Sequence, residues 1–544
     1  MPDIGEADWR GAFLGRFLNP SQIKFYEAVN SEIYVDKTEL LCYVNSVIRT
    51  EQKYICVSRP RRFGKSVTAN MLTAYYGKKN NAEQLFEGLK ITKDSSFKKH
   101  LNQYNVIWLN MQDFLSAGRD IKGFIDGIRN SLIREIEKEI MQIGVIKERY
   151  DIGDLKDYLY DLYEYSYTPY VFVIDEWDCI FREYRESGEI QKAYLDFLRD
   201  LLKDEEYIAL VYMTGILPIK KYGSHSALNM FDEFSMTNAG PLSEFVGFTD
   251  QEVDALSGQY GMDREEMKLY YDGYHLEKTG SVYCPRSVVN ALRFHRFDYY
   301  WNQTETFEAL RVYVDMNFEG LRDRVIIMLA GGRCQINPHN FQNDMITFGD
   351  RDDVLTLLVH LGYLAFDQEK SEVFIPNEEI RAEFVQVISR SKWTEVSDAI
   401  LNSEKMLQAI WDRDADMVAK GIQKAHLETS YLQYNDENAL SYTISLALYT
   451  ARNYYTVIRE LPSGRGAADM VFLPRKKYPD KPALLVELKW NRSAEGAIGQ
   501  IGRKQYSEVL ADYKENMLLV GVNYDKDTKE HSCVIEMLLL GGEK

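Results

Sequence analysis

The first 240 residues alternate between short apolar segments and amphipathic stretches, and this alternation restricts the fold more than any other feature. The apolar segments, each a strand candidate, are KYICVS (53–58), VIWLNM (106–111), YVFVIDE (170–176) and YIALVYMT (207–214). The stretches 65–76, 121–142 and 189–203 between them are helix candidates. Buried strands joined by helices form a mostly parallel sheet covered on both faces. The sequence therefore predicts an N-terminal α/β domain.

The rest of the chain predicts three further kinds of structure. Residues 249–330 are mainly helical by pattern. Residues 351–390 give a helix, two short strands (LGYLAFD and EVFIP) and another helix, which is the order of a winged helix. A final α/β segment covers 457–544. At about 150 residues per domain, a chain of 544 residues holds three or four domains.

Composition narrows the cellular setting and the surfaces that could meet nucleic acid. Apolar runs are too short to cross a bilayer, and the N-terminal sequence lacks a signal pattern. Six scattered cysteines without a CxxC pair favour a reducing compartment, so we expect a cytoplasmic protein without a membrane partner. The formal net charge is −18, but residues 431–544 hold equal numbers of basic and acidic residues. A polyanion could therefore approach this C-terminal region most easily, although ordinary variation explains the difference equally well.

A phosphate-binding loop is indicated by RPRRFGKS, where a strand candidate leads into Gly64, Lys65 and Ser66 and then a helix. Backbone N–H groups at a helix start favour phosphate. Lys65 is placed to contact the β- and γ-phosphates, and Ser66 to hold Mg²⁺. The usual pattern GxxxxGK[ST] has glycine where this chain has Arg59, so the match is imperfect.

The end of the strand candidate YVFVIDE supplies the second half of a nucleotide site. Asp175 falls at the carboxyl edge of the sheet, where open α/β folds bind ligands. It is a candidate Mg²⁺ ligand, and Glu176 is a candidate base that orients or deprotonates water. Thr214 ends the next strand; it either senses the γ-phosphate or is structural.

Basic side chains crowd the predicted loop and leave two readings open. Guanidinium groups stabilise charge on a transferring phosphoryl group, but they could equally bond acidic neighbours. We favour Arg62 for phosphate contact. The loop candidates for nucleotide binding are Arg61, Arg62, Phe63, Gly64, Lys65 and Ser66.

A second constellation lies near the C-terminus, in AADMVFL and VELK. Glu487 and Lys489 are two apart on a strand candidate, so they share a face. A hairpin through PRKKYPDKP would bring Asp469 beside them. Two carboxylates suit Mg²⁺ or Mn²⁺, and a neighbouring lysine stabilises charge during phosphodiester cleavage. An ExK pair alone is common in surface strands, and it is Asp469 at this spacing that makes the combination more specific.

Helices on either side add further candidates to this constellation. Glu437 begins ENALSYTISLALYTA and could supply a third carboxylate. Gln500 and Tyr506 lie on GAIGQIGRKQYSEVL and could reach the scissile phosphate, with Arg503 and Lys504 nearby.

Segments along nearly the whole chain resemble the AAA-ATPase-like proteins of bacteria. These are YVDKTELL (34–41), SRPRRFGKS (58–66), FVIDEWD (172–178), MTGILPI (213–219), VGFTDQEV (246–253), YYDGYH (270–275), VYCPRSVVNAL (282–292) and IPNEEIRAEF (375–384). Members carry a C-terminal domain of the PD-(D/E)XK nuclease superfamily, which GRGAADMVF, LLVELKW and IGQIGRKQY resemble. The resemblance implies that Lys65, Ser66 and Asp175 bind nucleotide. It also implies that Asp469, Glu487, Lys489 and Gln500 match the nuclease core.

We therefore expect five parts. They are a P-loop ATPase-like domain (1–245), a helical extension (246–335), a winged-helix-like module (336–395), a helical linker (396–430) and a restriction-endonuclease-like α/β domain (431–544). The acidic helix EEIRAEF favours domain packing over DNA binding for the winged-helix-like module.

The expected function is ATP binding or hydrolysis that controls a Mg²⁺-dependent nuclease acting on DNA or RNA. A role in defence fits this coupling, although no residue indicates it. The alternative is a signalling or scaffold ATPase whose inert nuclease fold binds a partner. Assembly into a homo-oligomer stays open.

Overall fold

The computed structural model divides the chain into two compact units. The first comprises residues 1–303 and 335–380, and the second comprises residues 304–334 and 381–544. The structure describes residues 15–115, 120–143, 154–219, 228–301, 310–313, 318, 320–341, 348–390, 393–428, 437–463, 466–503, 510, 513 and 515–538. In this part of the chain, no helix is both long enough and apolar enough to cross a membrane.

A parallel five-stranded sheet forms the centre of the first unit, as the sequence predicted. Its order is β2-β3-β4-β1-β5. The strands are β1 (Tyr54–Ser58), β2 (Asn105–Asn110), β3 (Tyr170–Asp175), β4 (Ile208–Gly215) and β5 (Asp232–Phe234). All residues of β1, β3 and β4 are buried, because helices lie on both faces. The four apolar segments of the sequence are thus confirmed as strands of one parallel sheet.

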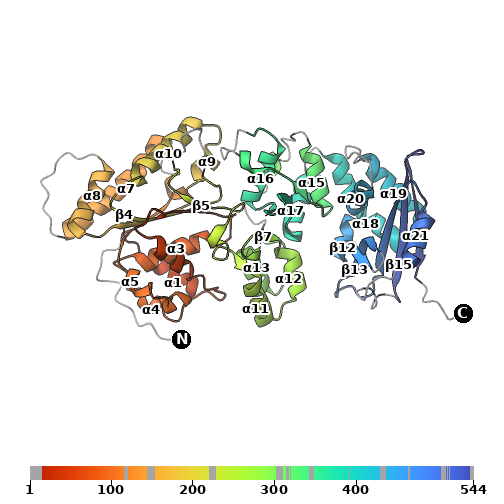
Figure 1. Ribbon diagram of the computed structural model, residues 1–544, viewed down its shortest axis with the longest axis horizontal. Coiled ribbons are helices and arrows are strands. Elements are labelled where there is room, and N and C mark those ends of the chain that lie inside the picture. The colour runs from red at the N-terminus through yellow and green to blue at the C-terminus, as the bar shows by residue number, and fades with distance from the viewer. Residues whose placement is uncertain are drawn as a thin grey trace. The chain divides into compact units, whose positions relative to one another are not determined.

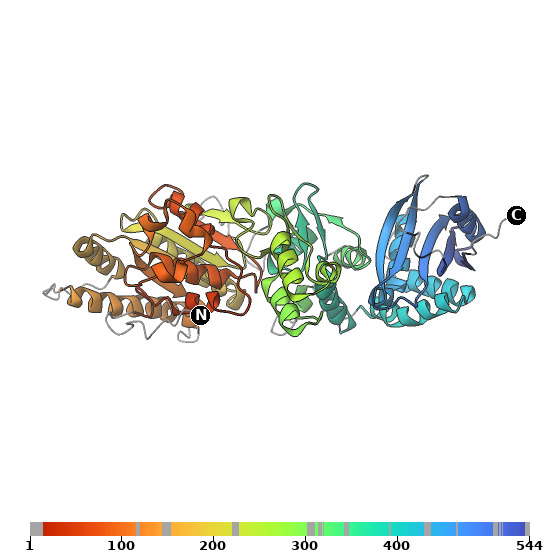
Figure 2. The same ribbon diagram turned by 90° about the horizontal axis from the view of Figure 1, so that it is seen from below.

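Two groups of helices cover this sheet (Figures 1 and 2). One group lies around α3 and the other around α7 and α10, on opposite faces. The first group is α1 (Ile23–Val29), α2 (Leu40–Val47), α3 (Lys65–Tyr76), α4 (Glu83–Phe86) and α5 (Phe97–His100). The second is α6 (Gln112–Leu115), α7 (Ile121–Gln142), α8 (Leu155–Ser166), α9 (Cys179–Glu183) and α10 (Gly188–Leu202). Side-chain caps at Asp120 and Ser187 satisfy free N–H groups and so fix where α7 and α10 begin.

The chain just before α1 covers the exposed edge of β2. The Phe17 carbonyl accepts the backbone N–H of Trp108 at 2.8 Å, and the backbone N–H of Asn19 donates to the Val106 carbonyl at 2.7 Å. The carboxylate of Glu135 on α7 holds this segment in place: it accepts hydrogen bonds from the backbone N–H groups of residues 16, 17 and 18 at 2.8–3.0 Å. The protein's own chain therefore covers this edge of the sheet.

The remainder of the first unit contains two small sheets with helices. One sheet has the order β6-β8-β7 and the other β10-β11-β9. The elements of the first are β6 (Phe248–Thr249), α11 (Asp250–Tyr260), α12 (Arg264–Tyr271), β7 (Tyr274–Leu276), β8 (Gly280–Tyr283) and α13 (Pro285–Phe294). Those of the second are β9 (Cys334–Gln335), α16 (Arg351–Leu361), β10 (Ala365–Asp367), β11 (Glu372–Phe374) and α17 (Glu378–Ser389). Of these, Cys334 and the part of α17 from Arg381 onward are assigned to the second unit. The expected order of helix, two strands and helix is present in 351–389.

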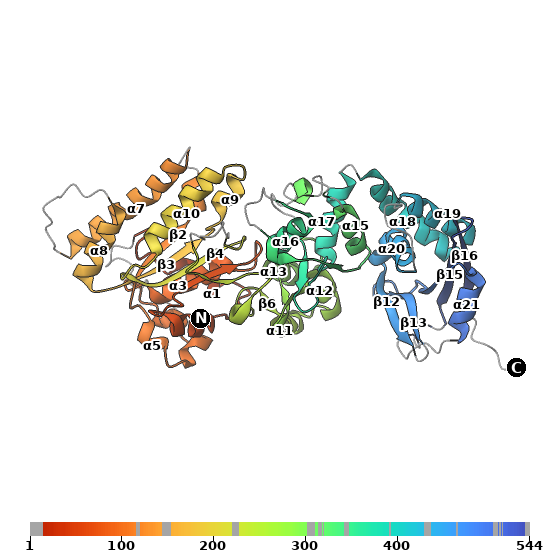
Figure 3. The same cartoon turned by 45° about the horizontal axis from the view of Figure 1, so that its top comes forward.

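The second unit is built on a mixed five-stranded sheet of order β12-β13-β14-β15-β16. Its strands are β12 (Tyr455–Ser463), β13 (Gly466–Pro474), β14 (Ala483–Trp490), β15 (Met517–Asp525) and β16 (Glu530–Met537). Its helices are α15 (Leu321–Leu329), α18 (Thr394–Trp411), α19 (Ala415–Glu428), α20 (Glu437–Ala447) and α21 (Ala494–Arg503). Figure 3 shows α18, α19 and α20 gathered on one side of this sheet and α21 on the other side. The predicted hairpin is confirmed: β13 and β14 pair antiparallel, with Val471 opposite Leu485.

Close packing of α21 on β15 predicts a strong effect for Gly521→Ala. A Cβ at Gly521 would lie 2.4 Å from the backbone oxygen of Ala494 and 3.1 Å from Ile498. Because backbone cannot give way cheaply, we expect a loss of about 1–3 kcal/mol in unfolding free energy, measured by urea unfolding. The matched control is Gly258→Ala within α11, where nothing lies near the new methyl group. That change should stabilise by about 0.5–1 kcal/mol, and equal effects from both variants would contradict the packing argument.

Candidate nucleotide and nuclease sites

The predicted phosphate-binding loop connects the buried strand β1 to α3. Gly64 precedes the helix with a φ of +93°, a left-handed conformation that glycine adopts without strain. Lys65 follows as the first helical residue, 5% exposed, and its Nζ donates to the carbonyl oxygens of Arg59 and Pro60 at 2.9 Å each. The ammonium group thus lies across the loop's own backbone.

Three carboxylates balance the charge of Lys65. Burial lowers the pKa of Lys65, and the nearby charges of Glu176, Asp175 and Asp178 oppose that shift. A buried cation next to acids at the carboxyl edge of a parallel sheet suits a phosphate chain with its metal ion.

Asp175 ends β3 directly beside Thr214 of β4 in the sheet register. Burial raises the pKa of Asp175 to about 6, although a hydrogen bond with the Ser66 side chain and the charge of Lys65 act in the opposite direction. The two candidate Mg²⁺ ligands, Ser66 and Asp175, are therefore brought together. The hydroxyl of Thr214 donates to the carbonyl of Val57 at 3.0 Å, so it bridges two strands.

Glu176 has a φ of +53°, which is unusual for a residue with a side chain. This conformation costs roughly 1–2 kcal/mol, and residues that keep it are enriched at functional sites. Its carboxylate forms an ion pair with Arg182 of α9. Burial alone would raise the pKa of Glu176, but Lys65 and Arg182 outweigh it and leave the pKa below its usual value.

Arg182 also approaches Asp178, with Nε 3.4 Å from Oδ2. Asp178 is fully buried and accepts the backbone N–H of Leu217 at 3.0 Å. Burial raises the pKa of Asp178, while Arg182 counteracts it. Sequence reasoning missed both residues, although the third position after Asp175 and a following helical arginine were visible in FVIDEWDCIFR.

The arginines of the loop face different surroundings. Arg59 is fully buried and donates to the carbonyl oxygens of Ser58 and Phe234, and burial lowers its pKa to about 10. Arg62, which we favoured for phosphate contact, donates through Nη1 to the carbonyl oxygens of Tyr300 and Trp301. Arg61 is half-buried, and its charge lowers the pKa of Glu176.

Phe63, the remaining predicted loop residue, is buried. Its ring meets those of Tyr274 and Trp301 edge-on, with centroids 5.2 and 6.5 Å apart. The sequence analysis predicts no chemical role for Phe63 beyond membership of the loop, and the structure shows this aromatic packing.

At the second site, β14 presents Glu487 and Lys489 on one buried face. Glu487 is 1% and Lys489 6% exposed, and their charged atoms lie 3.2 Å apart. Asp469 on β13 accepts the backbone N–H of Leu488 through Oδ2 at 2.6 Å. The structure therefore brings together the three residues that the sequence selected.

The chemistry of this set fits a hard cation. Carboxylate oxygens are the donors that Mg²⁺ and Mn²⁺ prefer, and Mg²⁺ often uses only one or two of them with substrate phosphate. Asp469 and Glu487 would hold such an ion. Within the described ranges no group of three or more His, Cys, Asp or Glu residues could do so alone.

For two other candidate residues the structure describes only the backbone. Glu437 is the first residue of α20, which packs against β14, and Gln500 lies in α21, which packs against β14 and β15. The side chains of both, and Tyr506 altogether, lie outside the described part of the chain.

Glu379 on α17 is a buried carboxylate close to the nucleotide site that sequence reasoning did not single out. Its Oε1 accepts the backbone N–H groups of Tyr300 and Trp301 at 2.6 and 2.7 Å, and Oε2 accepts the hydroxyl of Ser287 at 2.8 Å. An acidic residue in the helix IPNEEIRAEF carries no sequence signal for burial.

The substitution Glu379→Gln should remove a pH dependence of stability. Burial raises the pKa of Glu379 from 4.5 to about 7 in the folded chain. Between pH 4.5 and 7 the Glu379 carboxyl is ionised in the unfolded chain but still holds its proton in the folded chain. The free energy of unfolding of the wild type therefore falls as pH rises, by about 3 kcal/mol in all. Glutamine keeps an acceptor for the two N–H groups but does not titrate. Urea unfolding measured between pH 4.5 and 7 should therefore show that the free energy of unfolding of the variant rises relative to that of wild type as pH rises. Parallel pH profiles for the two proteins would contradict the assignment.

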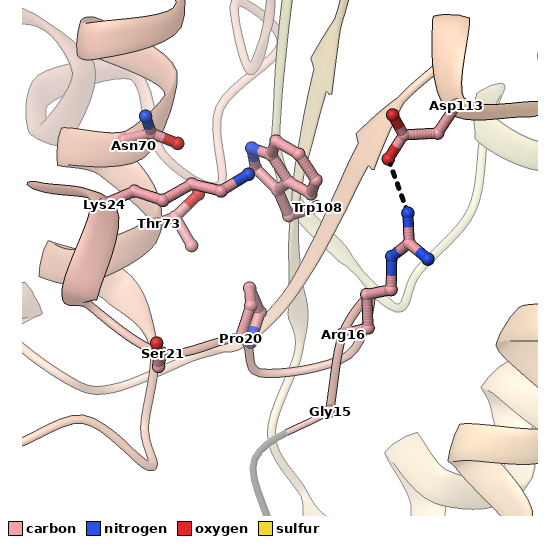
Figure 4. A pocket seen from close by; sticks show the side chains of 9 residues that line it. All are labelled: Gly15, Arg16, Pro20, Ser21, Lys24, Asn70, Thr73, Trp108 and Asp113. Carbon is pink, nitrogen blue, oxygen red and sulfur yellow. Dashed lines mark hydrogen bonds and ion pairs between the residues drawn. The ribbon is translucent and has the colours of Figure 1, made fainter.

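A separate pocket of about 430 Å³ lies beside β2 (Figure 4). The ammonium of Lys24 lies 3.8 Å from the ring centroid of Trp108, and Arg16 pairs with Asp113 at 3.0 Å. Asn70 and Thr73 of α3 line the same hollow. None of the residues predicted for nucleotide binding lines it, so it is distinct from the phosphate loop.

Comparison with known proteins identifies two domains in this chain. The sequence model of the family described as "Predicted AAA-ATPase" matches residues 23–224, and that of the PD-(D/E)XK nuclease superfamily matches residues 437–532. The chain carries an AAA-ATPase-like domain and a PD-(D/E)XK nuclease superfamily domain. This pairing agrees with the resemblance seen in the sequence motifs.

The individual relative found by sequence is distant. An uncharacterized protein in the vnfD 5′ region of Azotobacter chroococcum is 26% identical over 283 residues, which are 50% of this chain and 51% of that protein. The match thus spans about half of the relative's length.

Among solved structures, Aeropyrum pernix ORC2 in ADPNP–ADP complexes matches with 12% identity and a TM-score of 0.30, covering 68% of this chain and 98% of that one. C. elegans PCH-2 matches with 14% identity and a TM-score of 0.22, covering 46% and 54%.

Proposed function

We propose that this protein binds and hydrolyses ATP and that its nucleotide state controls a Mg²⁺-dependent nuclease in the same chain. The observation that carries the proposal is the buried pair Glu487–Lys489 beside Asp469, on a chain that also places Lys65 next to Asp175. A buried ion pair is costly to desolvate and is weak evidence for stability alone, which favours a chemical role.

At the nucleotide site, each residue has a distinct task. Lys65 would exchange the carbonyl oxygens of Arg59 and Pro60 for the β- and γ-phosphates of ATP. Ser66 and Asp175 would hold Mg²⁺, which supplies charge neutralisation when bound. Glu176, whose pKa is low enough for it to be ionised, would orient the attacking water. Arg182 fixes the direction of that carboxylate, and Thr214 is a candidate for sensing the γ-phosphate.

At the nuclease site, Asp469 and Glu487 would hold a divalent cation that activates water and binds the scissile phosphate. Lys489 is close enough to Glu487 to stabilise negative charge on that phosphate. Glu437 and Gln500 are proposed as helix-borne additions. The substrate is DNA or RNA, bound by a region whose net charge is zero.

The finer organisation belongs to the same proposal. We retain the five expected parts, with boundaries near residues 245, 335, 395 and 430, and a winged-helix-like module around α16 and α17. The setting proposed is the cytoplasm, with a role in defence as one use of such a coupling.

A second candidate is a signalling ATPase whose nuclease fold only binds a partner. The observation that favours it is the position of Asp469, since one of its oxygens is already engaged by the Leu488 N–H group. In that case no metal-dependent cleavage should appear under any condition.

The decisive experiment measures cleavage of single- and double-stranded DNA and RNA with Mg²⁺ or Mn²⁺, with and without ATP. Wild type is compared with Glu487→Gln and Lys65→Ala. Cleavage that is lost in Glu487→Gln and no longer responds to ATP in Lys65→Ala is the expected result. If Lys65→Ala loses nucleotide binding but cleaves at the wild-type rate at every ATP concentration, the proposed coupling is wrong.

A further inference from the structure

The short segment Tyr300–Trp301 is held between the side chains of an arginine and a glutamate. From one side, Arg62 of the phosphate loop donates to both carbonyl oxygens of the segment. From the other side, Glu379 of α17 accepts both of its N–H groups. The loop and the helix therefore hold the backbone of the same two residues, the loop through their carbonyl oxygens and the helix through their N–H groups.

Packing leaves the loop little freedom to move without this segment. The ring of Phe63 meets Trp301 edge-on, and the thiol of Cys284 donates to the Arg62 carbonyl at 3.7 Å. Gly362 has a φ of +87°, and a Cβ there would lie 2.7 Å from Pro60 and 2.9 Å from Trp301.

The backbone conformation of Arg62 links these contacts to the shape of the phosphate loop. Its φ is +70°, which a residue with a side chain keeps only when its surroundings enforce it. Arg62 lies two residues before Gly64, so its backbone sets the path by which the loop enters α3. The contacts that enforce the conformation lead to Glu379.

We propose that Glu379 is a positioning residue of the nucleotide site, acting through Tyr300–Trp301 and Arg62 to hold the loop in its phosphate-binding shape. This inference rests on the proposed ATP site and adds a route for its regulation. Movement of α17 would change nucleotide affinity, and by reciprocity nucleotide binding would restrain α17.

Helix α17 makes further contacts beyond Glu379. The helix is continuous from Glu378 to Ser389, and its residues up to Ile380 belong to the first unit while those from Arg381 belong to the second. Within the second unit, Arg381 donates to the carbonyl oxygens of Met328 and Leu329 at 3.0 and 2.6 Å. The helix that holds the nucleotide loop is thus also held at Arg381 by the end of α15.

The test is a double-mutant cycle on ATP binding in the full chain, measured by titration calorimetry with Mg²⁺ present. The variants are Glu379→Ala, Arg62→Ala, their combination and Glu379→Gln, with exposed Glu369→Ala as the control. We expect Glu379→Ala to weaken ATP binding by about 10-fold. Glu379→Gln should bind within about 3-fold of wild type, because its carbonyl oxygen still accepts both N–H groups. The combination should bind no more weakly than Arg62→Ala, since both act through one segment.

Several outcomes would overturn the inference. They are wild-type affinity in Glu379→Ala, fully additive losses in the combination, or equal losses in Glu379→Ala and Glu369→Ala. If Glu379→Ala does not fold, Ser287→Ala takes its place in the cycle, because it removes one hydrogen bond from the same carboxylate; a loss that is additive with Arg62→Ala would again reject the route. Failure of wild type to bind ATP would instead reject the proposed function itself, and this inference with it.

Discussion

Replacing Glu487 with alanine should lower metal-dependent cleavage on the order of 10³-fold, because it removes a carboxylate that would hold the catalytic cation. It should also weaken the fold. Lys489 is 6% exposed and has Glu487 as its ion-pair partner at 3.2 Å, so its charge would remain buried without that partner. Removing one member of a buried pair costs about 3–5 kcal/mol. Cleavage assays and urea unfolding of the same preparation measure the two losses.

A double variant separates these two effects. In Glu487→Leu/Lys489→Met both charges are replaced by apolar side chains of similar size, and such replacements are often neutral or stabilising. We therefore expect stability near that of wild type and no cleavage. Cleavage that returns with stability would show that the pair is structural and that the reaction takes place elsewhere.

Replacing Lys65 with alanine should weaken ATP binding by about 10²-fold or more. Hydrogen bonds to charged groups contribute about 1.5–3 kcal/mol each, and the lysine would make at least two to the phosphates. Its removal also leaves Asp175, Glu176 and Asp178 with less positive charge nearby, which further disfavours an anionic ligand. Calorimetric titration with ATP and Mg²⁺ measures the change.

The matched control for this variant is Lys90→Ala. Lys90 belongs to the same unit, but it is exposed and pairs with Glu39 at 3.1 Å on the surface. It should bind ATP as wild type does. A Lys65→Ala protein that retains wild-type affinity would remove the phosphate loop from the proposed site.

Much of this architecture could be predicted because its signals are local. Each strand of the parallel sheet is a short apolar run, and Gly64 marks the turn where a left-handed residue is needed. The hairpin of β13 and β14 followed from two strands joined by a proline-containing turn. Residue pairs such as Glu487 and Lys489 share a face through the two-residue period of a strand.

Other features depend on residues far apart in the chain and left no local pattern. Arg62 meets carbonyl groups 238 and 239 positions away, and Glu379 lies 79 and 78 positions from the N–H groups that it accepts. Predicting the ion pair between Arg182 and Glu176 would have required the direction in which α9 leaves the end of β3. Propensity and spacing describe single elements, whereas these contacts are decided by how the elements pack.

The capping of β2 by Phe17, Leu18 and Asn19 has a practical consequence. A strand edge with free N–H and C=O groups is a template on which another chain can add a strand. A shortened protein that begins after Asn19 would lose this cover, and with it the three backbone groups that Glu135 binds. Such a protein should associate with other copies of itself through this edge and precipitate. Residues 17–19 therefore protect the solubility of the protein as well as its structure.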